Sequence, residues 1–176
     1  MDMGIHYPIS VNISRLHIYD PTLVQKLISL TNKYGVPVEL LELEFTEGLF
    51  MENVHMLYGL MYDLKKQGFV LQMDDFGSGF SSLNMLKSVP IDVIKLDKAF
   101  FEDINENARG KIIIEDSIRM IHNLDLEVMA EGIETQEHVD FLNQCNCIIG
   151  QGYYYAKPMS IEDFDERLIQ PALLNK

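Results

Sequence analysis

The stretch FVLQMDDFGSGFSSL, residues 69–83, decides the fold. It begins with an apolar run of strand length, passes two acids and a Gly-Ser-Gly turn, and ends in a short helical segment. The same order of strand and helix recurs on both sides of it. Strands are predicted at 8–14, 40–45, 69–73, 93–96, 127–130 and 148–155, each followed by a helical pattern. Strands and helices that alternate in this way indicate a parallel sheet built from β-α units.

Start and stop signals delimit the helices between these strands. Asp20 as N-cap and Pro21 at the first helical position begin one helix, and Gly35 stops it. The expected buried positions of this helix are Leu23, Val24, Leu27, Ile28 and Leu30, and those of the next are Val54, Leu57, Met61 and Leu64, before Gly68. Further helices are expected near 82–87, around 111–124, after the cap Thr135 and from Ser160.

Six β-α units predict an α/β fold of the TIM type, in which a complete (β/α)8 barrel takes ~250 residues. The chain has 176 residues, so we expect an incomplete barrel of about six units. An open doubly wound sheet is the alternative, but it usually places a glycine-rich phosphate loop after its first strand, and none is found there. With 47% hydrophobic residues, the chain is long enough for one well-cored domain and hardly for two, so residues 1–176 are expected to form a single domain.

The charge of the chain excludes some classes of function. Fourteen Lys and Arg against 27 Asp and Glu give a formal net charge of -13, which opposes binding to duplex nucleic acid. No apolar run approaches the ~18 residues of a membrane span, and the first residues lack the pattern of a signal peptide. We therefore expect a cytoplasmic chain without a membrane segment. Cys145 and Cys147 have no partners that would complete a zinc site.

Acids stand where the predicted strands end. They are Glu44, Asp74 with Asp75, Asp97 and Glu131, while Asn12 has the matching place in the first strand and Lys95 and Gln151 stand close by. In a parallel barrel all carboxyl ends of strands open onto one face, so these side chains are expected to converge. Oxygen ligands without Cys or His favour Mg²⁺, Mn²⁺ or Ca²⁺. Two such ions would activate a phosphodiester and the water that attacks it.

Two plainer interpretations stay open. Any one of these acids can instead cap the helix that follows it, although four successive strands that end in acid weaken that explanation. Gly77-Ser78-Gly79 is either a mobile loop that closes over the site or an ordinary turn.

Six motifs in this order resemble a known family. They are SVNIS at 10–14, EFTE at 44–47, DDFGSGFSSL at 74–83, PIDVIKLD at 90–97, AEGIET at 130–135 and QGY at 151–153. Together they resemble the EAL domain, a bacterial phosphodiesterase that hydrolyses cyclic di-GMP to linear pGpG. The resemblance covers essentially the whole chain and implies a barrel of the EAL type.

The resemblance also implies a role for each matching residue. A two-metal site for Mg²⁺ or Mn²⁺ is implied, with one ion held by Asn12, Glu44 and Asp74 and the other by Asp74, Asp75 and Glu131. The catalytic group would be Lys95, which activates water, with Asp97, Glu131 and Glu134 around it. Glu47 would steady the loop that contains Phe76, Gly77, Ser78 and Gly79, and Gln151 would line the substrate pocket.

The sequence departs from the family pattern at its front. No Glu-Ala-Leu motif is present, nor the strand and the phosphate-contacting arginine that go with it, so the first metal would lack one expected ligand. We therefore expect an N-terminally truncated domain whose unpaired strand edges favour a homodimer or a partner that completes the barrel.

Three functions follow as hypotheses. The first is a cyclic di-GMP phosphodiesterase. The second is a catalytically impaired domain that binds cyclic di-GMP or a protein partner as a regulatory module, and the third is a fragment with neither activity.

Overall fold

A computed structural model describes residues 7–51, 53–77, 83–101 and 108–169. The strands are β1 Ile9–Asn12, β2 Leu41–Thr46, β3 Val70–Phe76, β4 Val93–Leu96, β5 Glu127–Ala130 and β6 Ile149–Gly150. The α-helices are α1 Arg15–Ile18, α2 Leu23–Tyr34, α3 Val54–Lys66, α4 Ala108–Asn123, α5 Gln136–Gln144 and α6 Ile161–Ile169. Short 3-10 helices are η1 Val38–Leu40, η2 Glu47–Met51, η3 Met85–Lys87 and η4 Lys98–Phe100.

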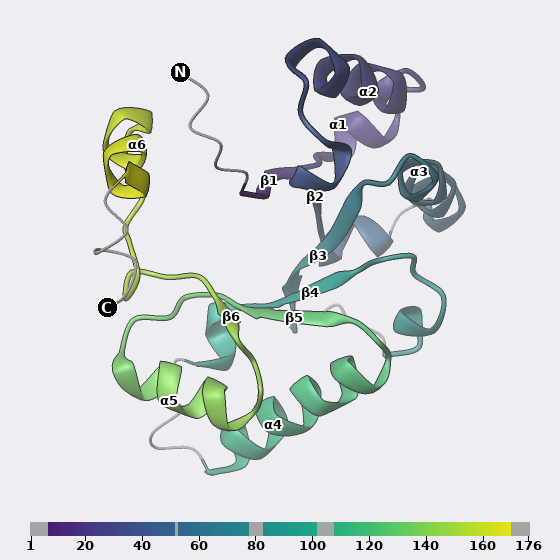
Figure 1. The fold of residues 1–176 in the computed structure, drawn as a ribbon. Coiled ribbons are helices and arrows are strands. Elements are labelled where there is room, and N and C mark those ends of the chain that lie inside the picture. The colour runs from purple at the N-terminus through teal and green to yellow at the C-terminus, as the bar shows by residue number, and fades with distance from the viewer. Residues whose placement is uncertain (1–6, 52, 78–82, 102–107, 170–176) are drawn as a thin grey trace.

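All six strands are parallel and lie in sequence order from β1 to β6. The sheet curls, and helices α2 to α5 lie along its convex outside (Figure 1). A doubly wound sheet would reverse its strand order partway, and this one does not. The prediction of an incomplete (β/α)8 barrel of about six units is confirmed.

The core lies between the outward side chains of the strands and the inner faces of the helices. Leu43 and Phe45 of β2 and Leu71 and Met73 of β3 are fully buried there. The helices bury Leu57, Met61 and Leu64 of α3, which contacts β3, and Ile114, Ile118 and Ile121 of α4, which contacts β5. Because successive strand residues point to opposite faces, the residues between these apolar ones point to the concave side of the sheet.

The structure differs from the prediction in where one helix begins and in which helix residues are buried. The carboxylate of Asp20 accepts hydrogen bonds from the backbone and hydroxyl of Thr22, so it caps a turn, and α2 begins later, at Leu23, with Thr22 as its N-cap. Leu30 and Val54 were expected to be buried, but they are 50% and 39% exposed. The cap at Thr135 is confirmed, since its hydroxyl accepts from the backbone of His138.

The sixth strand is much shorter than expected. β6 has two residues, and the chain then turns, with the backbone N–H groups of Tyr155 and Ala156 both bonded to the carbonyl of Gly152. A run of aromatic residues favours a strand in sequence, but these turn hydrogen bonds replace the ladder. In the described parts of the chain, no helix is long and apolar enough to cross a membrane.

Candidate metal centre

Side chains from four strands meet at the carboxyl ends of the sheet. The ammonium Nζ of Lys95 on β4 lies 2.8 Å from Glu44 Oε1 of β2, 2.7 Å from Glu131 Oε1 after β5 and 3.2 Å from Asp74 Oδ1 of β3. Lys95 and Glu44 are buried, and Asp74 and Glu131 are partly buried. The predicted convergence of these four residues is therefore found in the structure.

An irregularity in β3 brings two consecutive acids to the same place. In a regular strand Asp74 and Asp75 would point to opposite faces. The register between β3 and β4 shifts between Met73 and Phe76, and the backbone of Asp75 adopts a left-handed conformation with φ 57°. This β-bulge re-aims the second carboxylate. The sequence contains no sign of the bulge, because it depends on pairing with β4.

The bulge brings three candidate ligand groups together. Asp74, Asp75 and Glu131 each offer a carboxylate oxygen, and these three atoms lie within 4.8 Å of one another. Carboxylate oxygens at this spacing fit Mg²⁺ or Mn²⁺, which prefer oxygen donors, and the cluster contains no Cys or His that would favour zinc. The set is the one that the family resemblance implies for one of the two ions.

The electrostatics of the cluster also call for a cation. Burial favours the neutral form of Lys95, but hydrogen bonds to Glu131 and Glu44 outweigh burial and hold the pKa of the ammonium above its ordinary value. Burial raises the pKa of Glu131. Burial and then the neighbouring charge of Asp74 raise the pKa of Asp75. One ammonium therefore faces more carboxylate charge than it neutralises, and divalent cations would relieve the excess.

Two further acids support the loops around the cluster. The carboxylate of Glu47, which is 1% exposed, accepts from the backbone N–H of Gly77 at 3.1 Å. Asp97 accepts from the backbone N–H of Ala99 at 2.8 Å, which fixes the start of η4. Phe76 is part of the core rather than of an open surface. Ser78 and Gly79, the other predicted loop residues, lie outside the described residues.

A hollow of about 410 Å³ opens beside the carboxylates. Its lining comprises Asp75, Asp97, Lys98, Glu131, Gly132, Glu134, Gln151, Gly152 and Tyr153. The structure thus gathers the predicted Asp97, Glu134 and Gln151 next to Asp75 and Glu131, two of the clustered acids. Asn12 lies apart from this lining: it is exposed on the edge strand β1, paired in register with Glu44.

The sequence interpretation missed the lining residue Lys98, whereas it considered Tyr153 as a residue that stacks on a base. Lys98 brings a positive charge to the hollow, and the Tyr153 ring, 59% exposed, has Lys157 Nζ 5.4 Å from its centroid. A cation and an exposed aromatic ring suit a ligand with a phosphate and a base. A sequence signal existed for Lys98, because it directly follows the strand-end acid Asp97.

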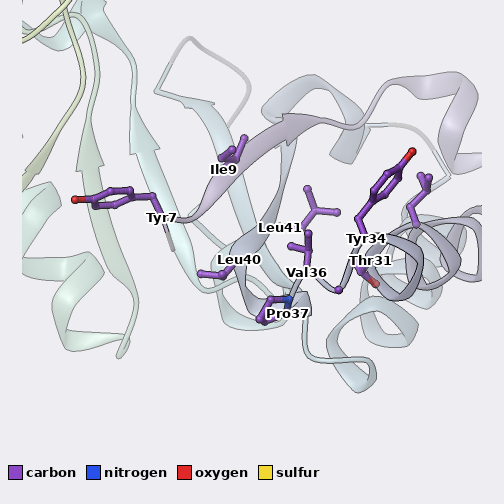
Figure 2. A pocket seen from close by; sticks show the side chains of 10 residues that line it. Tyr7, Ile9, Thr31, Tyr34, Val36, Pro37, Leu40 and Leu41 are labelled. Carbon is purple, nitrogen blue, oxygen red and sulfur yellow. The ribbon is translucent and has the colours of Figure 1, made fainter. Parts of the chain in front are cut away.

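A second hollow, of about 520 Å³, has a different character. It lies at the β1 edge of the sheet, and Figure 2 shows Tyr7, Ile9, Tyr34, Val36, Leu40 and Leu41 around it. Among the described residues, no acid or base lines this hollow. The acids and the lysine that could take part in chemistry line the hollow beside the carboxylates.

Comparison with known proteins agrees with this geometry. The family model described as "EAL domain" matches residues 1–158. "Signaling protein YkoW" of Bacillus subtilis is 34% identical over 169 residues, which are 96% of this chain and 21% of that protein. "Cyclic di-GMP phosphodiesterase NbdA" of Pseudomonas aeruginosa is 34% identical over 160 residues, which are 91% of this chain and 20% of that protein. The chain thus spans about a fifth of the length of these curated relatives.

Solved structures share the fold. The EAL enzyme Bd1971, in a form bound to cAMP and cyclic di-GMP, has a TM-score of 0.87 and 30% identity, and the match covers 92% of this chain and 43% of that chain. Klebsiella pneumoniae BlrP1, in a complex with manganese and cyclic di-GMP, has a TM-score of 0.82 and 25% identity, with 87% of this chain and 39% of that chain covered.

Proposed function

The chain belongs to the EAL domain family, and from this premise we propose that it is a metal-dependent phosphodiesterase module that hydrolyses cyclic di-GMP to linear pGpG. One observation carries the proposal: Asp74, Asp75 and Glu131 place three carboxylate oxygens within 4.8 Å of one another, beside the buried Lys95. This is an arrangement that a hydrolytic metal centre needs, and it opens onto a hollow of about 410 Å³.

The residues present fit one Mg²⁺ or Mn²⁺ ion and offer an incomplete ligand set for a second. Asp74, Asp75 and Glu131 would hold one, and Asn12 and Glu44 would join Asp74 at the other. Such a pair of ions, when bound, supplies a polarised phosphodiester and a hydroxide at neutral pH. The manganese complex of the related BlrP1 supports the choice of metal.

The chain's own side chains would position the attacking water and stabilise the charge that develops on the phosphate. The ammonium of Lys95 keeps its charge in the buried cluster, so it can orient the attacking water and offset negative charge that develops on the phosphate. Lys98 at the rim of the hollow adds a second positive charge near the phosphate, and the amide of Gln151 offers both a donor and an acceptor to a base. Asp97 and Glu134 would orient the groups around the acids.

The deciding experiment is hydrolysis by the chain itself. Purified chain is incubated with cyclic di-GMP and Mn²⁺, and pGpG is separated from substrate by chromatography. Glu44→Ala serves as the blank, because it removes a proposed ligand. Production of pGpG above this blank is expected, and equal traces from both proteins would refute the proposal.

A second candidate function is binding of cyclic di-GMP without turnover. Asn12 favours it: this proposed ligand of the first ion lies exposed on the edge strand, so only part of that ion's ligand set is enclosed. In that case calorimetry would show saturable binding of cyclic di-GMP while the chromatogram stays free of pGpG.

We also propose that two copies of the chain associate through the open side of the sheet. The support is the exposed apolar surface there, which includes Ile9 at 62%, Tyr7 at 53% and Tyr34 at 68% exposed. Light scattering at micromolar concentration is expected to report a dimer, and a strictly monomeric mass would contradict this. The cytoplasmic location expected from the sequence stays a prediction.

A further inference from the structure

The short helix η4 lies between the loops that carry two of the metal-binding acids. It follows β4 directly and contains Lys98, Ala99 and Phe100. On one side its Phe100 ring lies against Gly77, two residues after Asp75. On the other side its Lys98 lies against Gly132, the residue after Glu131.

Both contacts are so close that only glycine fits. A Cβ atom placed on Gly77 would lie 2.0 Å from Cε2 of Phe100, and one on Gly132 would lie 2.3 Å from Cβ of Lys98. Both glycines have positive φ, 93° and 67°. The two loops therefore contact η4 through the backbones of Gly77 and Gly132. These glycines have no side chain that could change its conformation to relieve a closer approach. The width of η4 consequently limits how closely the two loops can approach.

The loop on the Phe100 side needs such a support. The left-handed backbone of Asp75 is unfavourable for a residue with a side chain and persists only where the surroundings enforce it. Beyond Asp75, Phe76 accepts a hydrogen bond from the backbone N–H of Asp97 and Gly77 donates to Glu47. The Phe100 ring lies against the backbone of this turn at Gly77. It is half-buried and packs on the core, so its position is fixed.

We infer that Phe100 is a positioning residue for the metal centre. Its ring holds Asp75 in the bulged conformation and, through η4, sets the distance between Asp75 and Glu131. Phe100 touches neither the substrate hollow nor the carboxylates among the contacts described. It acts through Gly77. This inference rests on the proposed function only in that the acids are taken to bind a divalent cation.

The test measures Mn²⁺ binding without substrate, by the loss of the free-ion signal in electron paramagnetic resonance. Phe100→Ala is expected to weaken Mn²⁺ binding about 10- to 100-fold, the usual effect of removing a group that orients metal ligands. Phe100→Leu, which keeps an apolar side chain against Gly77, is expected to recover most of the affinity. Phe141→Ala is the matched control, because it removes a partly buried ring that packs on the same core from α5. It should leave the affinity unchanged.

Gly77→Ala tests the same contact from its other side and keeps the inference testable if Phe100→Ala folds poorly. Gly77→Ala inserts a methyl group where the Phe100 ring lies and should also weaken Mn²⁺ binding. Where Phe100→Ala does fold, the double variant should bind about tenfold more tightly than the product of the two single effects predicts, because both changes disrupt one contact.

The outcomes separate the inference from the proposed function. Unchanged Mn²⁺ affinity in Phe100→Ala, or equal losses in Phe100→Ala and Phe141→Ala, would overturn the positioning role while the metal centre stands. Multiplicative effects of Gly77→Ala and Phe100→Ala would overturn it too. No Mn²⁺ binding by the unaltered chain, or the same binding by Asp74→Asn, would overturn the metal centre and the inference together.

Discussion

Lys95→Met is the substitution that tests the electrostatics of the site most directly. Methionine keeps the length and apolar stem of lysine but removes its charge. In the unaltered chain, the Lys95 ammonium pairs with Glu44, Asp74 and Glu131. The variant leaves these carboxylates without their shared cation. We therefore expect the metal-free variant to be destabilised, and divalent cations to restore much of the loss.

The size of the effect follows from the burial of the groups. Lys95 is 3% exposed, whereas the side chains of Glu44, Asp74 and Glu131 are 7%, 14% and 20% exposed. Removing one partner of a buried ion pair costs about 3 to 5 kcal/mol. Because the carboxylates keep some contact with water, we take the lower end, about 3 kcal/mol. For a chain of this size, that loss lowers the melting temperature by roughly 6 to 12 °C.

The assay is urea unfolding of both proteins, first in a chelator and then in Mn²⁺. An ion present at 100 times its dissociation constant stabilises the folded state by about 2.7 kcal/mol. Cations should bind the variant's uncompensated acids more tightly than the unaltered cluster, whose charge Lys95 already offsets in part, so the difference in unfolding free energy between the two proteins should narrow in Mn²⁺.

Lys65→Met is the matched control. Lys65 pairs with Asp92 at 2.5 Å, but both side chains are about a third exposed. A partly exposed pair of this kind contributes about 1 kcal/mol, so the control should lose little stability in either solution. Equal unfolding free energies for Lys95→Met and the unaltered chain in chelator would refute the reasoning, as would a difference that Mn²⁺ leaves unchanged.

The other predictions concern the metal, the thiols and the core. Asp74→Asn, which keeps the shape but removes a charge shared by the proposed ligand sets, should reduce Mn²⁺ affinity at least tenfold in a calorimetric titration, and unchanged affinity would remove Asp74 from the site. Burial raises the pKa of the Cys147 thiol to about 11 from 9.0, so the folded chain keeps a proton that the unfolded chain releases, and the free energy of unfolding should fall between pH 9 and 11; Cys147→Ala should remove part of this fall. A thiol reagent at pH 8 should modify the partly exposed Cys145 before Cys147, which mass mapping would check. Leu57→Ala on α3 should cost about 3 kcal/mol because Leu57 is fully buried, whereas Met56→Ala, with a side chain 48% exposed, should cost under about 0.5 kcal/mol in the same denaturation series.

Local patterns in the sequence accounted for most of the fold. The apolar runs and helix signals placed all six strands and the helices after them, and the parallel arrangement followed from their alternation. The errors fall where local signals compete. Asp20 has the residue type of an N-cap and forms a turn instead, and aromatic residues after β6 suggest a strand where turn hydrogen bonds prevail.

The site was predictable in its composition and less so in its geometry. Strand-end acids had to converge because parallel strands end on one face, and Lys95 indeed meets Glu44 and Glu131 there. The contributions of Lys98 and Phe100 were not predicted. They arise from contacts between loops that follow different strands, and no sequence spacing records those contacts.

The sequence by itself determined which residues stand at the strand ends and that those ends share one face. Only the tertiary structure decided that Asp74 and Asp75 point the same way, since a regular strand would separate them. Residue type and periodicity are local properties, and they fix the strands and their order. A bulge depends on pairing with β4 and on packing against η4, which bring together residues that are distant in the chain, so it exists only once the sheet has formed.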